Sequence, residues 1–315
     1  MAGNSTRAIL FALGANFAIS IAKGVAAYFT KSGAMLAETV HSLADCGNQL
    51  LLLLGMKQAV RPPSPEHPLG EGKSVYFWSF LVAVMLFTVG GMFSLYEGVH
   101  KLQHPEPLTK WWWAVGVLSF SIAAEALSTR AALQEAAKER EGRSLWRWFR
   151  ESRKAELIVI VGENLAALFG LIVALVAIGL TVLTGNPLWD AIGTIVIGLL
   201  LIVVAVFVAR EVKALLIGQS IDPVRQGQMR AFLEARPEIV HLLNLITLQL
   251  GNDVMVTVQA QMREEASTSA LAQQIDVLER DFKANFQEVK WSFFEPDTKP
   301  ESMECLIEAA ATSAR

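Results

Sequence analysis

Six apolar stretches, each long enough to cross a bilayer, follow one another before Ile217. They lie approximately at residues 8–29, 34–60, 75–100, 111–133, 155–184 and 188–217. An α-helix needs about 20 apolar residues to cross roughly 30 Å of hydrocarbon. After Ile217 charged residues return, and the apolar residues come in short runs or at helical spacing. The pattern predicts a membrane protein with a six-helix transmembrane domain over residues 1–217 and a separate domain over residues 218–315.

The composition supports this interpretation and excludes other classes. Charged residues make up 18% of the chain and hydrophobic residues 53%, with a mean hydropathy of +0.39, whereas soluble proteins carry about 25% charged residues. The net charge of -3 gives no indication of nucleic-acid binding. Cys46 and Cys305 lie far apart and form no disulfide or metal-binding pattern. The first apolar run is too long for the core of a cleavable signal peptide, so we expect it to be the first span.

Basic residues are concentrated in the loops after the second and fourth stretches. The loops on the opposite side have only Lys31, Lys101 and Lys110. The basic loops contain Lys57, Arg61 and Lys73, and then Arg130, Lys138, Arg140, Arg143, Arg147, Arg150, Arg153 and Lys154. Since loops rich in Lys and Arg stay in the cytoplasm, both termini should be cytoplasmic. The basic run 138–154 could also bind anionic lipid.

The C-terminal region has the pattern of a small cytoplasmic α+β domain. Helical periodicity at 223–235 and at Ser267–Phe286 alternates with β-rich segments at 240–250, 254–262 and 289–295. Gly251-Asn-Asp253 is a hairpin signal between the first two strands. The order α-β-β-α-β predicts a ferredoxin-like sheet of about three strands with helices on one face. Residues after Pro300 should be helical or loose.

A polar stripe interrupts the second apolar stretch. Glu38, His41, Asp45, Asn48 and Gln49 recur at intervals of three or four residues and therefore share one side of a helix. Ionisable groups inside a membrane are costly and usually line an ion or proton path. His41 and Asp45 supply an imidazole nitrogen and a carboxylate oxygen one turn apart. This pair suits zinc, and also manganese, iron(II) or cobalt.

Two donors leave a tetrahedral metal site half complete. The candidates for completing it are the other polar residues of the apolar stretches: Glu163 with Asn164 beside it, Glu125, Glu97 with His100, and Asp190. Each also has a structural explanation. Glu163 and Glu125 could make interhelical hydrogen bonds, and Glu97 and His100 could end a span. Asp190, which follows Asn186-Pro187, is better explained as a first-turn residue at a helix N-terminus.

Enzymatic motifs are missing from the sequence. It contains no nucleophilic triad, P-loop or dinucleotide fingerprint, and Gly70-Glu-Gly72 is too short to indicate one. Glu125 and Glu163 as catalytic acids would have no accompanying nucleophile. We therefore expect the chain not to be an enzyme.

Taken together, these features resemble the cation diffusion facilitator family. Ala37-Glu38-Thr-Val-His41-Ser-Leu-Ala-Asp45 is similar to the motif of the family's second span, and His67-Pro-Leu-Gly-Glu-Gly-Lys73 to that of the following loop. Six spans, a basic loop between the fourth and fifth, and an α-β-β-α-β tail complete the resemblance. Gly162-Glu163-Asn164 and Phe293-Phe294-Glu295-Pro296 look like the branch with the animal mitochondrial zinc transporter and its bacterial relatives.

The resemblance implies a homodimeric, proton-coupled antiporter that exports a divalent metal, zinc first, from the cytoplasm. The family's transport site combines two residues of span two, here His41 and Asp45, with two of span five. The usual His/Asp-x-x-x-Asp motif of span five is absent, because Val159 stands four residues before Glu163. Glu163 is therefore carried over as third ligand and Asn164 as a candidate fourth. Mn²⁺, Fe²⁺ and Co²⁺ remain open as cargo.

Further expectations follow for partners and location. Glu38, Asn48 and Gln49 would hold the metal ligands in place, and the tail would be a dimerisation module without metal sites. With no transit peptide visible, a bacterial inner membrane is favoured. The alternative is a non-transporting membrane scaffold or metal sensor whose tail binds a partner, which the incomplete span-five motif leaves open.

Overall fold

The chain forms two compact units, Met1–Leu216 and Ile217–Arg315. The structure, a computed structural model, describes residues 2–140 and 142–297, and the side chains of these residues except 2–13 and 15. The two units are described separately below. The predicted helical or loose segment after Pro300 lies outside the described residues.

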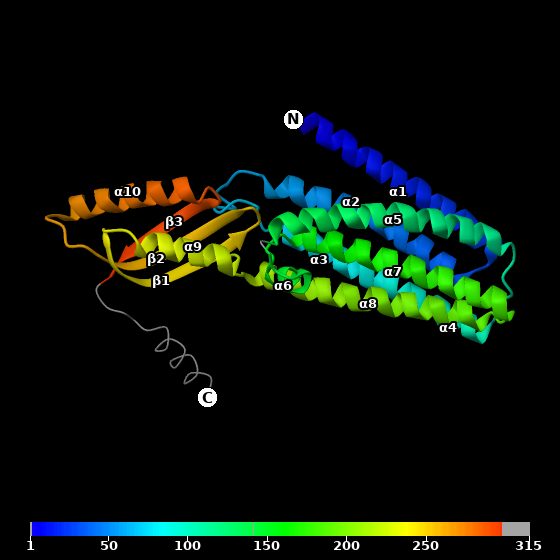
Figure 1. Cartoon of the computed structure of the whole chain (residues 1–315). Coiled ribbons are helices and arrows are strands. Elements are labelled where there is room, and N and C mark those ends of the chain that lie inside the picture. The colour runs from blue at the N-terminus through cyan, green and yellow to red at the C-terminus, as the bar shows by residue number, and fades with distance from the viewer. Residues whose placement is uncertain (1, 141, 298–315) are drawn as a thin grey trace. The chain divides into compact units, whose positions relative to one another are not determined.

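All the regular secondary structure described in the first unit is helical (Figure 1). Each apolar stretch of the sequence lies in a long helix or, for the third stretch, in three consecutive helical segments. The elements are α1 (Ala2–Thr30), α2 (Gly33–Ala59), α3 (Ser74–Met85), η1 (Leu86–Met92), α4 (Phe93–Gln103), α5 (Trp111–Glu139), α6 (Leu145–Glu151), α7 (Ala155–Thr184) and α8 (Leu188–Ile217). The segment η1 is a π-helix, a rare and wider form than the α-helix.

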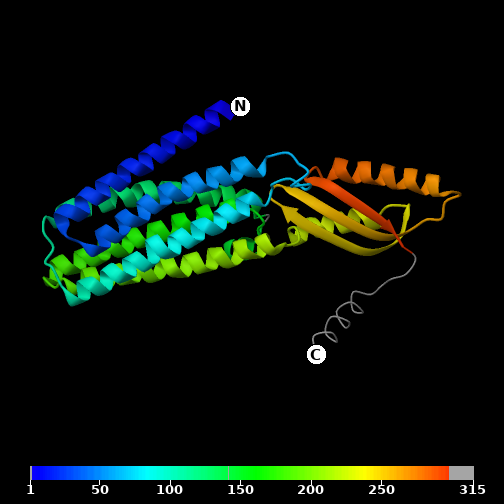
Figure 2. The same ribbon diagram turned by 180° about the vertical axis from the view of Figure 1, so that it is seen from behind.

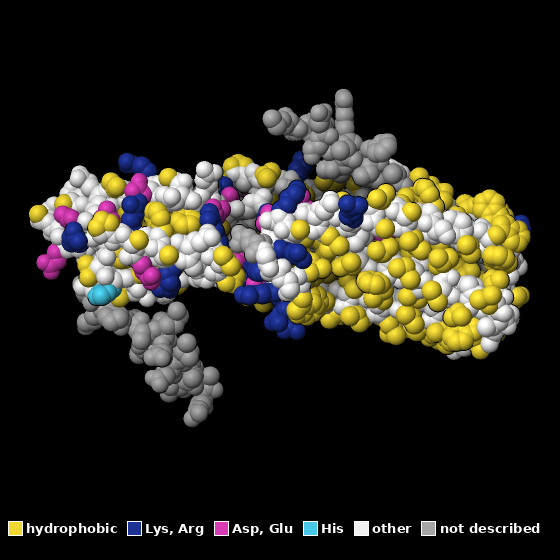
Figure 3. All heavy atoms as spheres, in the orientation of Figure 1, with side chains coloured by type: hydrophobic (Ala, Val, Ile, Leu, Met, Phe, Trp, Pro, Cys, Tyr) yellow, Lys and Arg dark blue, Asp and Glu magenta, His cyan; other side chains and the backbone are white. Residues whose placement is uncertain are grey.

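Four helices among the described residues are both long and apolar enough to cross a membrane. They are Ser74–Gln103, which joins α3, η1 and α4, together with α5, α7 and α8. The predicted first and second spans, α1 and α2, are 29 and 27 residues long but are not among these four. In α2 the polar stripe lowers the hydropathy. The surface agrees with a membrane environment, since hydrophobic side chains cover the flank of the helical unit (Figure 3).

The basic segment between α5 and α7, which was predicted as a loop, contains a short helix. Helix α5 continues to Glu139, and the short helix α6 follows, capped by Ser144, whose Oγ accepts a bond from Arg147 N. Glu151 accepts bonds of 2.8 Å from Arg147 and 3.2 Å from Arg143. The hydrogen bond from Arg147 and the neighbouring positive charges hold the pKa of Glu151 below its usual value. Seven residues are too few for a recognisable helical period, so the sequence did not predict α6.

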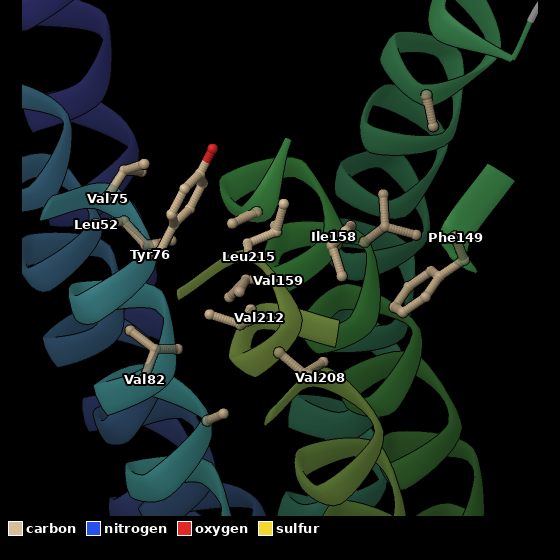
Figure 4. Packing of buried hydrophobic residues seen from close by; sticks show 14 of the residues in the cluster. Leu52, Val75, Tyr76, Val82, Phe149, Ile158, Val159, Val208, Val212 and Leu215 are labelled. Carbon is tan, nitrogen blue, oxygen red and sulfur yellow. The ribbon is translucent and has the colours of Figure 1, made fainter. Parts of the chain in front are cut away.

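One hydrophobic cluster fastens α6 to the bundle. Tyr76 and Val82 of α3 pack in the same buried cluster as Val159 of α7 and Val212 of α8 (Figure 4). Trp148 and Phe149, which are the buried residues of α6, belong to this cluster as well. These two aromatic side chains of α6 thus lie in the core, although the helix is rich in arginine and its Trp146 is exposed.

The second unit has the predicted element order. Helix α9 (Pro223–Glu234) precedes β1 (Ile239–Leu250) and β2 (Asp253–Met262), and α10 (Thr268–Asn285) precedes β3 (Val289–Pro296). The sheet order is β1-β2-β3, with β1 antiparallel and β3 parallel to β2. The hairpin is confirmed: Leu250 pairs with Asp253 across a turn in which Gly251 has a φ of 70°, a value that glycine adopts without strain.

Both helices of this unit cover the same face of the sheet. Alternate residues of β2, from Val254 to Ala260, are buried. They share one core with Met229 and Leu233 of α9 and with Leu278 and Phe282 of α10. In the reverse view α9 lies behind the strands (Figure 2). The opposite face of the sheet is not covered by any described helix of this unit.

Candidate functional site

The start of α2 is held by a neighbouring helix. Ser32 caps the helix and accepts a bond from Met35 N at 3.1 Å. The carboxylate of Asp190, in the first turn of α8, accepts bonds from Ser32 Oγ at 2.5 Å and Gly33 N at 2.6 Å. The sequence interpretation of Asp190 as a first-turn residue is confirmed for its position. Its hydrogen bonds, however, go to the N-terminus of α2 and not to its own helix.

The polar stripe of α2 faces the inside of the bundle. Glu38 and Asn48 are fully buried, and His41 is 1% exposed. Asp45 keeps 21% of its side chain exposed, and its Oδ1 lies 3.5 Å from His41 Nδ1. The helical period predicted this common face. The distance leaves the imidazole and the carboxylate adjacent without a normal hydrogen bond.

Helix α7 meets this stripe at two points. Asn48 Nδ2 donates a bond of 2.6 Å to Glu163 Oε1, and Glu163 is 7% exposed. At the Glu38 end of the stripe, α7 contacts α2 at Gly170. A Cβ added to Gly170 would lie only 2.5 Å from Glu38 Oε1. The missing side chain of Gly170 therefore lets the Glu38 carboxylate lie against the α7 backbone. Glu163, predicted as the third ligand, is thus linked to α2 through Asn48.

Several buried polar atoms at this place have no hydrogen-bond partner within the described part of the chain. Both ring nitrogens of His41, one carboxylate oxygen each of Asp45 and Glu38, and the amide oxygen of Asn48 are in this state. Buried polar atoms are normally paired, and an unpaired one costs about 1–3 kcal/mol. The oxygens and one of the two imidazole nitrogens can each give a lone pair to a cation, since the other nitrogen of a neutral imidazole carries a proton. The cluster has the donor chemistry of a cation site.

The other predicted residues lie elsewhere or form a separate contact. Asn164 is turned toward α5, where its Nδ2 donates to Ser128 Oγ at 3.1 Å. On α4, Glu97 is half-buried and His100 is exposed; His100 lies in the last turn, as expected for the end of a span. Over residues 2–140 and 142–297, no group of three or more His, Cys, Asp or Glu side chains is close enough to hold a metal ion. His41, Asp45, Glu163 and Asn164 therefore do not form a closed four-ligand set in this conformation.

A polar cavity of about 60 Å³ adjoins the stripe. This is room enough for water. Four helices line it, and its lining residues are Asn16, Ile19 and Lys23 of α1, Ser42 and Asp45 of α2, Ser121, Ala124, Glu125 and Ser128 of α5, and Leu171 of α7. Glu125, for which the sequence left both a packing and a ligand role open, thus shares a cavity with Asp45.

Sequence reasoning did not consider Lys23 of α1. Its Nζ donates to Ser42 Oγ at 2.7 Å and lies 3.2 Å from Glu38 Oε2, and both members of this ion pair are buried. A lysine in the middle of the first apolar stretch was the available signal, because a charge inside a membrane segment indicates function or pairing. Its partner could not be identified from the sequence alone.

Comparison with known proteins identifies the family of membrane transporters that this chain resembles. A family model described as the cation efflux transmembrane domain matches residues 9–217. The mitochondrial proton-coupled zinc antiporter SLC30A9 of Mus musculus is 35% identical over 233 residues, which are 73% of this chain and 41% of that protein. Metal tolerance protein C4 of Arabidopsis thaliana is 32% identical over 232 residues, 73% of this chain and 51% of that protein. The chain thus spans about half the length, or less, of these two relatives.

Proposed function

The chain belongs to the cation efflux family of membrane transporters, and from that premise we propose that it exports a divalent transition metal, zinc first, in exchange for protons. The proposal of zinc rests on the donor set and on the name of the SLC30A9 relatives, which are called proton-coupled zinc antiporters. Mn²⁺, Fe²⁺ and Co²⁺ are the alternative cargoes, because the same donor types bind them.

The proposed metal ligands are His41, Asp45 and Glu163. The unpaired atoms of His41 and Asp45 support this proposal, because buried polar atoms are normally paired and these types of atom bind transition metals. Glu163 is linked to the same helix by its hydrogen bond with Asn48 and would have to move closer to His41 and Asp45 to share an ion with them. Asn164, the fourth candidate, would have to leave Ser128 to join them. Glu125 competes for that position, since it lines the cavity with Asp45.

Proton coupling follows from sharing these ligands. Imidazole and carboxylate groups bind a metal only when deprotonated, so metal and protons compete for one site. Protons that enter from outside would then displace a metal ion bound from the cytoplasm. We propose that water and ions reach the buried imidazole by way of the adjoining cavity and Asp45, the partly exposed member of the pair.

The remaining parts of the proposal concern the membrane and the assembly. The six spans would be α1, α2, the continuous segment Ser74–Gln103, α5, α7 and α8. Helix α2 can be one of them because its polar stripe faces the bundle interior and not lipid. Both termini would be cytoplasmic, in a bacterial inner membrane. The α/β unit would join two copies of the chain through the uncovered face of its sheet, where Ile246 and Phe293 are 54% and 53% exposed.

The experiment that tests this function is metal uptake into proteoliposomes of the purified chain under an imposed pH gradient. Zn²⁺, Mn²⁺, Fe²⁺ and Co²⁺ would be offered separately to the wild type and to Asp45→Asn, Glu163→Gln and Glu125→Gln. We expect the gradient to drive Zn²⁺ uptake in the wild type, and Asp45→Asn and Glu163→Gln to abolish it. A loss in Glu125→Gln as well would identify the fourth ligand.

The matched control is Glu135→Gln, which removes an exposed carboxylate that pairs with Lys138 on α5. It should transport as the wild type does. Full transport by Asp45→Asn would refute the site, whereas transport that ignores the pH gradient would refute only the coupling. If the wild type moves none of the four metals, the chain is better explained as a scaffold or sensor.

A further inference from the structure

We propose that Lys23 is a built-in cation that balances the charge of the metal-free site and weakens its hold on a divalent metal, so that the ion can be released. This proposal rests on the proposed function, because it concerns the same site. It assigns a role to a residue of α1, a helix from which neither the sequence nor the comparisons draw a ligand.

The position of Lys23 is the first argument. Asn16, Ile19 and Lys23 lie three and four residues apart, so one face of α1 is turned toward the cavity. Lys23 itself is 3% exposed. Its ammonium group reaches Glu38 and Ser42, which lie one turn apart on α2 and on either side of His41 in the sequence. The cation is therefore placed against the helix that carries the proposed ligands.

The second argument is the balance of charge. Lys23 shares the cavity with Asp45 and Glu125, and Glu38 binds it directly. Three carboxylates thus lie around one buried ammonium group. Charges interact strongly when they are buried, because screening is weak. The positive charge of Lys23 lowers the cost of the empty acidic site and repels a second cation that enters it.

A purely structural role explains the ion pair less well. A buried ion pair is often no more stabilising than apolar side chains of the same size, because both charges lose their water. The pair also leaves Glu38 Oε1 without a partner. A device that only fastened α1 to α2 would not need an unpaired oxygen beside a cation site. The arrangement fits a group that tunes the charge of the site.

The proposal predicts effects of opposite sign for the two members of the pair. Zn²⁺ would be titrated by calorimetry into the full chain in detergent. Lys23→Gln removes the repelling charge and should tighten Zn²⁺ binding by about tenfold or more. Glu38→Gln leaves the ammonium group uncompensated and should weaken binding by a similar factor. The double variant Lys23→Gln/Glu38→Gln should return close to the wild-type affinity, and Lys23→Arg should keep it.

Uptake into proteoliposomes supplies a second readout. Lys23→Gln should reach half-maximal uptake at a lower Zn²⁺ concentration but have a lower maximal rate, because a more tightly held ion leaves more slowly. Lys57→Gln is the matched control, since Lys57 is an exposed lysine in the last turn of α2. Should Lys23→Gln not fold, Lys23→Met fills similar space without a charge and makes the same test.

The outcomes separate this proposal from the proposed function. If Lys23→Gln or Lys23→Met lowers only the melting temperature and leaves Zn²⁺ affinity unchanged, Lys23 is a packing residue and the proposal is wrong. Weaker binding in either variant would also overturn it, because Lys23 would then support the site. If the wild type itself shows neither Asp45-dependent Zn²⁺ binding nor uptake, the proposed function fails and this inference falls with it.

Discussion

Asp190 Oδ2 accepts a hydrogen bond of 2.6 Å from the backbone N–H of Gly33, so a carboxylate of α8 closes the first turn of α2. Its other oxygen accepts from Ser32 Oγ and, at 3.4 Å, from Ala34 N. A negative charge at a helix N-terminus is stabilising, because the first N–H groups lack partners and the helix dipole is positive there. This contact fixes the position of α2 along the helix bundle relative to α8, and with it the positions of His41 and Asp45.

Replacing Asp190 by Asn should therefore destabilise the helical unit. The variant loses the charge and places an amide NH₂ where an oxygen accepts bonds, which should cost about 1–3 kcal/mol. Thermal unfolding of the purified chain in detergent measures the effect. Glu135→Gln, which removes an exposed carboxylate on α5, should unfold as the wild type does. An equal loss of stability in both variants would mean that Asp190 is not special.

The bond between Asn48 and Glu163 gives a prediction about metal affinity. If Asn48 orients Glu163 as a ligand, Asn48→Ala should weaken Zn²⁺ binding by about 10–100-fold, the usual effect of losing a group that orients a ligand. Gln49→Ala is the comparison, because Gln49 lies about 100° further round the helix. Its effect should be much smaller. Calorimetric titration of both variants decides, and equal effects would contradict the orienting role.

The close packing of α8 against η1 and α4 depends on glycine. A Cβ on Gly198 would lie 2.7 Å from Leu95 N and 3.0 Å from Gly91 O. Both are backbone atoms, which cannot move aside, so Gly198→Ala should cost about 1–3 kcal/mol through overpacking. In α7, Gly179 has open space within 4 Å of the same point, and Gly179→Ala should be neutral or stabilising by about 0.5–1 kcal/mol. Melting temperatures in detergent compare the two.

The uncovered sheet face predicts how the α/β unit associates. Ile246 and Phe293 both pair with Thr257 and so form a row across the three strands. If this row joins two copies, Ile246→Arg or Phe293→Arg should shift the chain toward the monomer in light scattering at micromolar concentration. Val277→Arg places the same charge on α10, where Val277 is 49% exposed, and should leave the mass unchanged. A wild-type monomer would remove the basis for the prediction.

An ion pair in the α/β unit predicts a pH dependence. Burial tends to raise the pKa of Glu288, but bonds of 2.5 Å and 3.1 Å from Arg225 outweigh it, so the pKa lies below the usual value. A lowered pKa in the folded state stabilises the unit above the unfolded-state pKa, and this contribution is lost as the pH falls through the folded value. Glu288→Gln should thus speed amide exchange at Val254 and Val289 near pH 7 and make little difference at a pH below the folded-state pKa of Glu288. An equal effect at both pH values would contradict the assignment.

Much of the fold could be predicted because apolar runs and helical periods are local features. The predicted fifth and sixth stretches, 155–184 and 188–217, coincide with α7 and α8. The strands of the tail were predicted from β-rich composition and the Gly251 turn. Helix α6 was missed because tertiary packing of Trp148 and Phe149 holds it, and packing between distant segments leaves no local pattern.

The candidate site was only partly accessible for the same reason. The shared face of His41 and Asp45 follows from helical geometry alone. The contacts of Asn48 with Glu163 and of Lys23 with Glu38 join residues 115 and 15 positions apart, and no spacing rule predicts them. Adjacent residues on a helix point about 100° apart. Glu163 can therefore face α2 while Asn164 faces α5.

The π-helix η1 has a consequence for relatives whose chains differ in length at this place. A π-helical turn accommodates one more residue than an α-helical turn, so the segment can be regarded as an α-helix with a single inserted residue. Without that inserted residue, the residues of α4 would be rotated by about 100° around the helix axis. Lys101, whose ammonium group donates to Lys31 O at the α1–α2 turn, would then point away from its acceptor. Relatives that are one residue shorter here should have a regular helix and need a different cation at the turn.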